Sequence, residues 1–251
     1  MEIVGNGFVA GALRSIAPRH PGVVALAAGV SRIRAEYAHR DLARETALVT
    51  EQARRCASRG TRLLYFSTAS AALYGTPGCS GTEDCRHPPR TWYGEHKLAM
   101  EQLVRRSGCR WLILRLTHLV GPGQRPHQLV PALVAQALGG RVRILRGASR
   151  DLLDVDDFVA MTDLLLGAGI EGETVNVASG RSIEVDAIVD HVAALTGTDP
   201  VRTYVEEASR HTVSIERLRS LSPRTWAFGE DYYKGVLDRS VGALLRARAT
   251  R

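Results

Sequence analysis

Short apolar runs alternate with longer amphipathic stretches along most of this chain, and that alternation constrains the fold more than any other feature. The runs at 62–67 (RLLYFS) and 111–116 (WLILRL) are almost continuously apolar, which is typical of strands buried on both faces. Helical periodicity occupies 42–58 and 92–106. Strands that alternate with helices predict an α/β fold with a parallel sheet.

The same alternation predicts the other helices and strands. Further strands are predicted at 1–4, 22–28, 142–145 and 174–177, and further helices at 8–16, 129–138, 155–166, 183–195 and 231–246. Gly, Pro and Cys are frequent at 75–90, which is predicted to be a loop, and 201–225 is polar and predicted to be irregular.

Composition excludes several classes of protein. Hydrophobic residues make up 45% and charged residues 24%, as in an ordinary globular protein and unlike a disordered or fibrous chain. No apolar run is long enough to span a bilayer, and the N-terminus lacks a basic region before its apolar residues. We therefore expect a cytoplasmic protein. Its four cysteines are irregularly spaced and are expected to be free thiols.

The net charge of +7 is spread along the chain, and all but two of the 33 basic residues are arginine. A nucleic-acid-binding protein would be expected to carry a basic stripe with interleaved aromatics, so we predict no nucleic-acid partner. The charge fits attraction to phosphorylated small molecules instead.

No metal site is predicted. Cys79, Cys85 and His87 share one loop but lack a fourth ligand at a zinc spacing. The acids at 154, 156 and 157 come just before or within the start of a predicted helix, where carboxylates stabilise the helix dipole.

A glycine-rich motif follows the first predicted strand. Residues 5–10 (GNGFVA) fit G-x-G-x-x-A, in which glycines allow a tight turn and close approach of the backbone to a pyrophosphate. The motif predicts dinucleotide binding. Only residues 11–21 separate it from the next strand, which ends in Ala27-Ala28-Gly29 without the acid that usually binds the adenosine ribose.

Tyr93 and Lys97 form a Y-x-x-x-K pair on a predicted helix, where a spacing of four places both side chains on one face. An ammonium beside a phenol favours the phenolate, so we expect Lys97 to lower the pKa of Tyr93 and fit it for proton transfer. A hydroxyl-rich strand end, Ser67-Thr68-Ala69-Ser70, offers a group that could polarise a carbonyl.

With these motifs, residues 1–197 resemble the extended short-chain dehydrogenase/reductase family of nucleotide-sugar epimerases, dehydratases and ketoreductases. The segments that carry the resemblance are 5–10, 26–29 (LAAG), 66–68 (FST), 74–75 (YG), 82–84 (TED), 93–101 (YGEHKLAME), 114–116 (LRL), 121–123 (GPG), 150–157 (RDLLDVDD) and 176–180 (NVASG).

The resemblance implies a Rossmann-type sheet, with one departure. Two strands that usually follow the first helix have no counterpart here, so 22–28 matches the family's fourth strand. In a competing register 22–28 is the second strand, and Arg32 and Arg34 face a 2′-phosphate. The choice between NAD and NADP stays open, with NADPH slightly favoured for a reductase.

The resemblance also implies roles for individual residues. The catalytic residues would be Tyr93 and Lys97 with Thr68 or Ser70: counting from the strand selects Thr68, which we favour, and counting back from Tyr74-Gly75 selects Ser70. Glu83 and Arg150 would bind substrate, and His96 would face away from it. The residues expected at the cofactor are Gly5, Asn6, Gly7, Phe8, Val9, Ala28, Gly29, Tyr93, Lys97 and His118.

The expected organisation is one compact unit over 1–251, with a Rossmann core at 1–120 and 152–178 and substrate-capping segments at 121–151 and 179–251. The expected activity is NAD(P)-dependent reduction of a nucleoside-diphosphate keto-sugar. An epimerase with the same Tyr/Lys pair, a ketoreductase of another natural product and a non-catalytic binding protein are alternatives. A dehydratase is not expected, because residues 69–72 (ASAA) lack its acid pair. Oligomeric state is open, with a homodimer as the candidate assembly.

Overall fold

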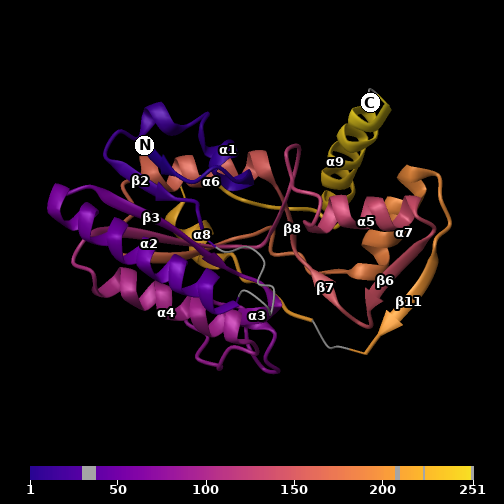
Figure 1. Cartoon of the computed structure of the whole chain (residues 1–251), viewed down its shortest axis with the longest axis horizontal. Helices are drawn as coiled ribbons and strands as arrows, with labels where there is room; N and C mark the ends of the chain where they lie inside the picture. Colours follow the sequence, from indigo (N-terminus) through magenta and orange to yellow (C-terminus); the bar gives the residue numbers. More distant parts are fainter. Residues whose placement is uncertain (30–37, 207–209, 223, 250–251) are drawn as a thin grey trace.

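A five-stranded parallel sheet forms the larger part of the molecule in the computed structural model, which describes residues 1–29, 38–206, 210–222 and 224–249 (Figure 1). Its strand order is β1-β2-β3-β4-β9. The strands are β1 (Glu2–Val4), β2 (Val23–Leu26), β3 (Arg62–Thr68), β4 (Arg110–Leu116) and β9 (Glu173–Val177). The predicted α/β class with a parallel sheet is confirmed.

Helices cover both faces of this sheet (Figure 1). On one face, α1 (Phe8–Leu13) and α6 (Val155–Gly167) enclose a core with the inward side chains of the strands, such as Leu64 and Leu112. On the other, α2 (Ala38–Arg59) and α4 (Trp92–Arg106) pack on side chains such as Leu63 and Ile113. Because alternate residues of one strand face opposite layers, both sides of β3 must be apolar.

The sheet lacks the two strands that usually follow the first helix, as predicted. Between α1 and β2, a stretch that the structure describes in full, the only regular element is η1 (Ala17–Arg19). β2 pairs with β1 on one side and β3 on the other, so it holds the position of the family's fourth strand. The competing register is therefore wrong; Arg32 and Arg34 lie outside the described residues.

A second, smaller part has its own apolar core (Figure 1, right). Its main elements are α5 (Leu129–Leu138), β6 (Arg141–Leu145), α7 (Val185–Thr196), β11 (Val201–Val205) and α9 (Tyr232–Ala249). Short strands connect it with the sheet: β5 (His118–Val120) pairs with β8 (Leu152–Asp154), and β7 (Ser149–Arg150) pairs with β10 (Ile183–Glu184).

Residues 201–225 differ from expectation. They contain β11, which pairs in parallel with β6, and α8 (Glu216–Leu221). β11 is mostly exposed, so its sequence carries no apolar run that would predict a strand. Residues 213–222 and 224–228, expected in the cap, pack on the sheet core through Val213, Leu218 and Trp226.

The prediction of four free thiols is wrong for two of the cysteines. Cys79 and Cys85 form a disulfide with their Cα atoms 6.1 Å apart, whereas Cys56 and Cys109 are free and buried. Gly78 and Gly81, both at positive φ, let the intervening loop turn back on itself. The bond occupies both sulfur atoms of the loop that we considered for zinc.

The acidic cluster at 154–157 has the predicted role at a helix start. Asp154 is the N-cap of α6, and its carboxylate accepts a hydrogen bond from the Asp156 N–H at 2.8 Å. Within the described ranges, no helix combines the length and apolarity needed to cross a membrane.

Candidate active site

The first two turns of α4 place Tyr93 and Lys97 at the carboxyl end of the sheet. Thr91 caps the helix by accepting a hydrogen bond from the Gly94 N–H at 3.2 Å. A Cβ at Gly94 would lie 2.3 Å from the Ala72 carbonyl oxygen, so only glycine lets α4 approach α3 (Ala71–Tyr74) this closely. Lys97 Nζ lies 5.8 Å from the centre of the Tyr93 ring, which confirms the predicted common face.

A buried polar network fixes the rest of α4. Arg115 on β4 donates from Nε and Nη2 to the two oxygens of Glu101 on α4, each at 2.8 Å. It also donates to the Tyr74 hydroxyl at 2.8 Å, and that hydroxyl donates to Asn176 Oδ1. A bidentate buried pair of this kind holds α4 against β4 in one register. The position of Tyr93 on α4 is therefore fixed by contacts with β4 as well as with α3.

The glycine-rich turn lies directly beside β2. Gly5 has a φ of +136°, and a Cβ on it would be 2.4 Å from the Ala27 carbonyl oxygen. Glycine is therefore required both for the backbone conformation and for the close approach. This contact brings the turn at 5–7 next to the end of β2. Residues of the turn and of the segment that follows β2 line a cavity.

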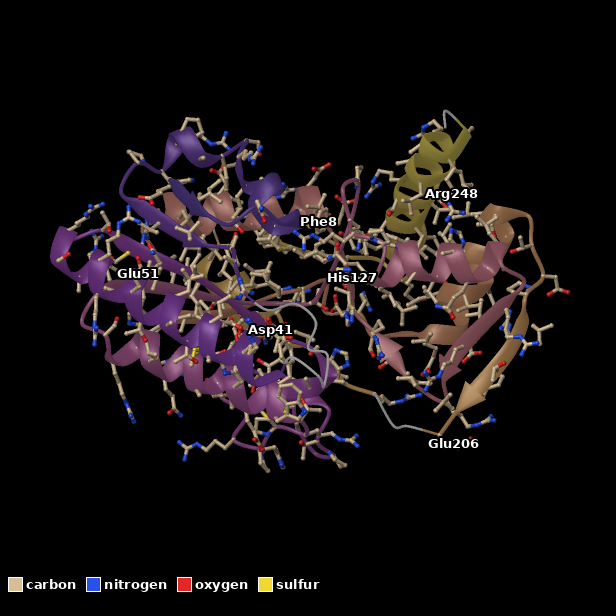
Figure 2. All side chains as sticks on the ribbon, viewed as in Figure 1. Phe8, Asp41, Glu51, His127, Glu206 and Arg248 are labelled. Atoms are coloured by element: carbon tan, nitrogen blue, oxygen red, sulfur yellow. A yellow bond between two sulfur atoms is a disulfide. The ribbon has the colours of Figure 1, made fainter. Side chains whose placement is uncertain are left out.

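That cavity has a volume of about 290 Å³ and runs from the glycine-rich turn to Tyr93 and Lys97. It is lined by Asn6, Gly7, Phe8, Val9, Leu26, Ala27, Ala28, Gly29, Arg44, Phe66, Ser67, Tyr93, Lys97, Leu116, Arg125 and Gln128. One of these residues is Phe8, the first residue of α1, which is labelled in Figure 2. Three lining residues are cationic, and none of those in the described part of the chain is a carboxylate, so the cavity suits a polyanion.

Eight of the ten residues expected at the cofactor line this cavity; Gly5 and His118 do not. Sequence reasoning missed Arg44 on α2 and Arg125, which follows the Gly121-Pro122-Gly123 turn. Arg125 Nη2 would be 3.9 Å from a Cβ on Gly7, which puts it over the glycine-rich turn. In a chain so rich in arginine, neither residue carries a signal of its own.

Tyr93 departs from the expected electrostatics. Burial raises the pKa of Tyr93 above its ordinary value of 10.0, although the Lys97 ammonium lowers it. The Glu45 carboxylate on α2 raises it further. Lys97 thus acts in the predicted direction, but burial and Glu45 outweigh it. The pKa of Tyr93 lies above 10.0, so its phenol is protonated at neutral pH.

The two candidate hydroxyls lie together. Thr68, at the end of β3, donates from Oγ1 to Ser70 Oγ at 2.9 Å, and Ser70 also accepts from the Ala72 N–H as N-cap of α3. Thr68 is buried and Ser70 is half-buried. The proton of Thr68 is therefore committed to Ser70, whereas the proton of Ser70 is available to another acceptor.

The expected substrate residues lie in different places. Glu83 is buried, and its Oε1 accepts from the Asn176 N–H at 2.7 Å, away from the cavity described above. Arg150 on β7 lies beside two imidazoles: burial, followed by the Arg150 charge, lowers the pKa of His118 to about 3 and that of His211 to about 4. Both histidines are neutral at pH 7, and sequence reasoning did not single out His211. His96 lies with its Nε2 3.4 Å from Glu45 Oε2.

This geometry agrees with the comparison of the chain with known families. The profile of the NAD-dependent epimerase/dehydratase family matches residues 10–178. The chain belongs to this family. The resemblance described from the sequence motifs, and the Rossmann-type fold expected from it, are thereby confirmed.

Among curated relatives of this family member, a dTDP-glucose 4,6-dehydratase of Xanthomonas campestris is 32% identical over 143 residues, 53% of this chain and 40% of that protein. A GDP-6-deoxy-D-mannose reductase of Pseudomonas aeruginosa is 26% identical over 186 residues, 64% of this chain and 60% of that protein. The chain thus spans about half the length of these relatives. The solved structure of MoeE5 in complex with UDP-glucose and NAD has the same fold, with a TM-score of 0.83, 20% identity and 98% of both chains covered.

Proposed function

We propose that this chain is an NAD(P)-dependent ketoreductase of a nucleoside-diphosphate keto-sugar. The observation that carries the proposal is the cavity in which Tyr93 and Lys97 lie at one end and the glycine-rich turn at the other, with a cationic lining. A protonated Tyr93 is the form that carbonyl reduction requires, since the reaction consumes a proton at the substrate oxygen. The family and the reductase among its relatives support the same reaction class.

The residues present fit a dinucleotide. Gly5 and Gly7 leave the turn without side chains, and Arg125 and Arg44 offer guanidinium groups to phosphate oxygens. Lys97 would contact the ribose nearest the reacting carbon. When bound, the cofactor supplies the hydride.

The chain's own groups would supply the remaining chemistry. Ser70 would donate a hydrogen bond to the carbonyl oxygen, because its acceptor positions are already used by Thr68 and Ala72. Tyr93 would deliver the proton to that oxygen. Lys97 would stabilise the resulting phenolate, and Arg150 would face the substrate diphosphate from β7. Thr68 would then be a support for Ser70, in contrast to our preference from strand counting.

Substitution of the hydroxyls tests this assignment. We expect Ser70→Ala to lower kcat/KM by roughly 10- to 10³-fold, the usual loss of one donor to a developing oxyanion. Thr68→Val should lower it by much less, because the side-chain shape is kept and only the support of Ser70 is lost. Steady-state kinetics with a keto-sugar substrate measure both, and the reverse ranking would return the role to Thr68.

A second substitution tests the cationic lining. Arg125→Ala should raise the Kd of NADPH about 10-fold or more, since one charge-assisted contact to phosphate is worth roughly 1.5–3 kcal/mol. Quenching or enhancement of bound NADPH fluorescence measures it. Arg86→Ala, which removes an arginine from the loop at 75–90 outside the cavity lining, is the matched control. An unchanged Kd in Arg125→Ala would remove this residue from the proposed cofactor site.

The deciding experiment is a turnover assay. Purified protein with NADPH is offered a panel of nucleoside-diphosphate keto-sugars, and product is identified by mass spectrometry. Net consumption of NADPH supports the ketoreductase. Interconversion of nucleotide sugars without added cofactor would support the epimerase instead, and absence of both reactions together with absence of cofactor binding would support a binding protein.

The division of the molecule also belongs to this proposal. Residues 1–120 and 152–178 would form the cofactor-binding core, and 121–151 with most of 179–251 would cap the substrate. The stretches at 213–222 and 224–228, which pack on the sheet core, would join the core instead.

A further inference from the structure

Lys97 has a buried counter-ion that no sequence motif indicates. Glu45, on α2, is 1% exposed, and its Oε1 lies 2.6 Å from Lys97 Nζ, itself on a residue 3% exposed. The Tyr65 hydroxyl on β3 donates to the same Glu45 oxygen at 3.1 Å and lies 3.5 Å from Nζ. Three elements thus meet at one carboxylate, immediately behind the lysine that faces the cofactor cavity.

The backbone at Gly29 lies close to this ion pair. A Cβ at Gly29, at the end of the β2 segment, would lie 2.9 Å from Glu45 Oε1 and 3.1 Å from Lys97 Nζ. Because glycine has no Cβ, the backbone at this position can lie close to Glu45 and Lys97 without a steric clash. His96 Nε2 lies 3.4 Å from the other carboxylate oxygen of Glu45, Oε2. The ammonium has three donors, and the described contacts direct two of them to Glu45 and Tyr65, which leaves one for the cavity.

We infer that Glu45 is a positioning residue for the proposed reduction: it fixes the Lys97 ammonium at the rear of the cavity and, as its counter-ion, sets the pH range in which Tyr93 holds its proton. This inference rests on the proposed function. Among the described contacts of the carboxylate, the charged and titratable groups are Lys97, His96 and Tyr93 on α4 and Tyr65 on β3. Without the Glu45 carboxylate, the positive charge of the Lys97 ammonium near Tyr93 is no longer balanced. The phenolate form of Tyr93 is then favoured.

The direction of the effect follows from the charges. Carbonyl reduction uses Tyr93 in its protonated form, so kcat/KM is present at low pH and falls as pH rises through the pKa of Tyr93. Glu45 opposes the influence of Lys97 on this pKa. Its removal therefore moves the falling limb to lower pH, and the expected shift is about 1–2 units for one buried charge nearby.

The first test needs no substrate. The ultraviolet absorbance of phenolate is followed against pH for each protein and for its Tyr93→Phe counterpart, and the difference isolates the titration of Tyr93. Glu45→Gln should lower this midpoint by about 1–2 units. Glu45→Asp keeps the charge but withdraws it by one methylene, so it should lower the midpoint by less. The order wild type, Asp, Gln supports the inference, and equal midpoints overturn it.

Loss of a carboxylate on α4 serves as the control. Glu95→Gln makes the same charge change at an exposed position of α4 and should leave the midpoint unchanged; a shift as large as that of Glu45→Gln would overturn the inference. Should Glu45→Gln not fold, the comparison of Glu45→Asp with wild type decides in the same way. The pH profile of kcat/KM then gives the second readout. A shifted titration without turnover on any keto-sugar would contradict the proposed function and leave the role of Glu45 supported.

Discussion

Tyr93→Phe is expected to lower turnover of the proposed keto-sugar reduction by about 10²-fold or more, the usual contribution of a positioned general acid. The change removes one hydroxyl from a ring that packs at the start of α4, so the fold and the Kd of NADPH should stay close to those of the wild type. Single-turnover kinetics and a fluorescence titration with NADPH separate the two effects. Full activity on the true substrate would show that another group delivers the proton.

Lys97→Met is expected to have the largest combined effect. It removes the ammonium that we propose stabilises the Tyr93 phenolate and contacts the cofactor, so turnover should fall and the Kd of NADPH should rise. It also leaves Glu45 buried without its counter-ion, which costs about 3–5 kcal/mol of the free energy of unfolding. Denaturant unfolding measures this loss, and cofactor titration and kinetics measure the others.

A double variant separates stability from chemistry. Lys97→Met combined with Glu45→Gln removes both charges, so it should recover much of the free energy of unfolding without recovering turnover. Lys97→Arg should not restore activity either, because a planar guanidinium is larger than the ammonium and a Cβ at Gly29 would already be only 3.1 Å from Nζ. Recovery of turnover in the double variant would contradict the role given to Lys97.

The parts of the fold that sequence could predict are those decided by local pattern. The apolar run of β3 and the four-residue spacing of Tyr93 and Lys97 each contain enough information within one segment. The loss of two strands could be predicted as well, because the stretch between α1 and β2 is too short to hold them.

The parts that could not be predicted depend on contacts between segments far apart. Glu45 meets Lys97 across 52 residues of chain, and nothing near it in the sequence marks it among the acids of α2. The pKa of Tyr93 also depends on burial and on that carboxylate, and together they outweigh the lowering by Lys97 that the Tyr/Lys pair predicts. β11 escaped prediction because its side chains are mostly exposed, and its strand geometry comes from pairing with β6.

The position of β1 at the edge of the sheet has a consequence for the lifetime of a bound dinucleotide. In a full Rossmann sheet, further strands extend the wall beside the first strand and add contacts on the adenosine side. Among the residues that the structure describes, β1 pairs only with β2 and so forms the edge of the sheet. Fewer contacts mean faster dissociation, since differences in affinity between related sites arise mainly in the off-rate. Rapid exchange suits a reductase, which must replace its oxidised dinucleotide after every turnover, whereas an epimerase gains by retaining it. We therefore expect the shortened sheet to speed the release of a bound dinucleotide from this chain.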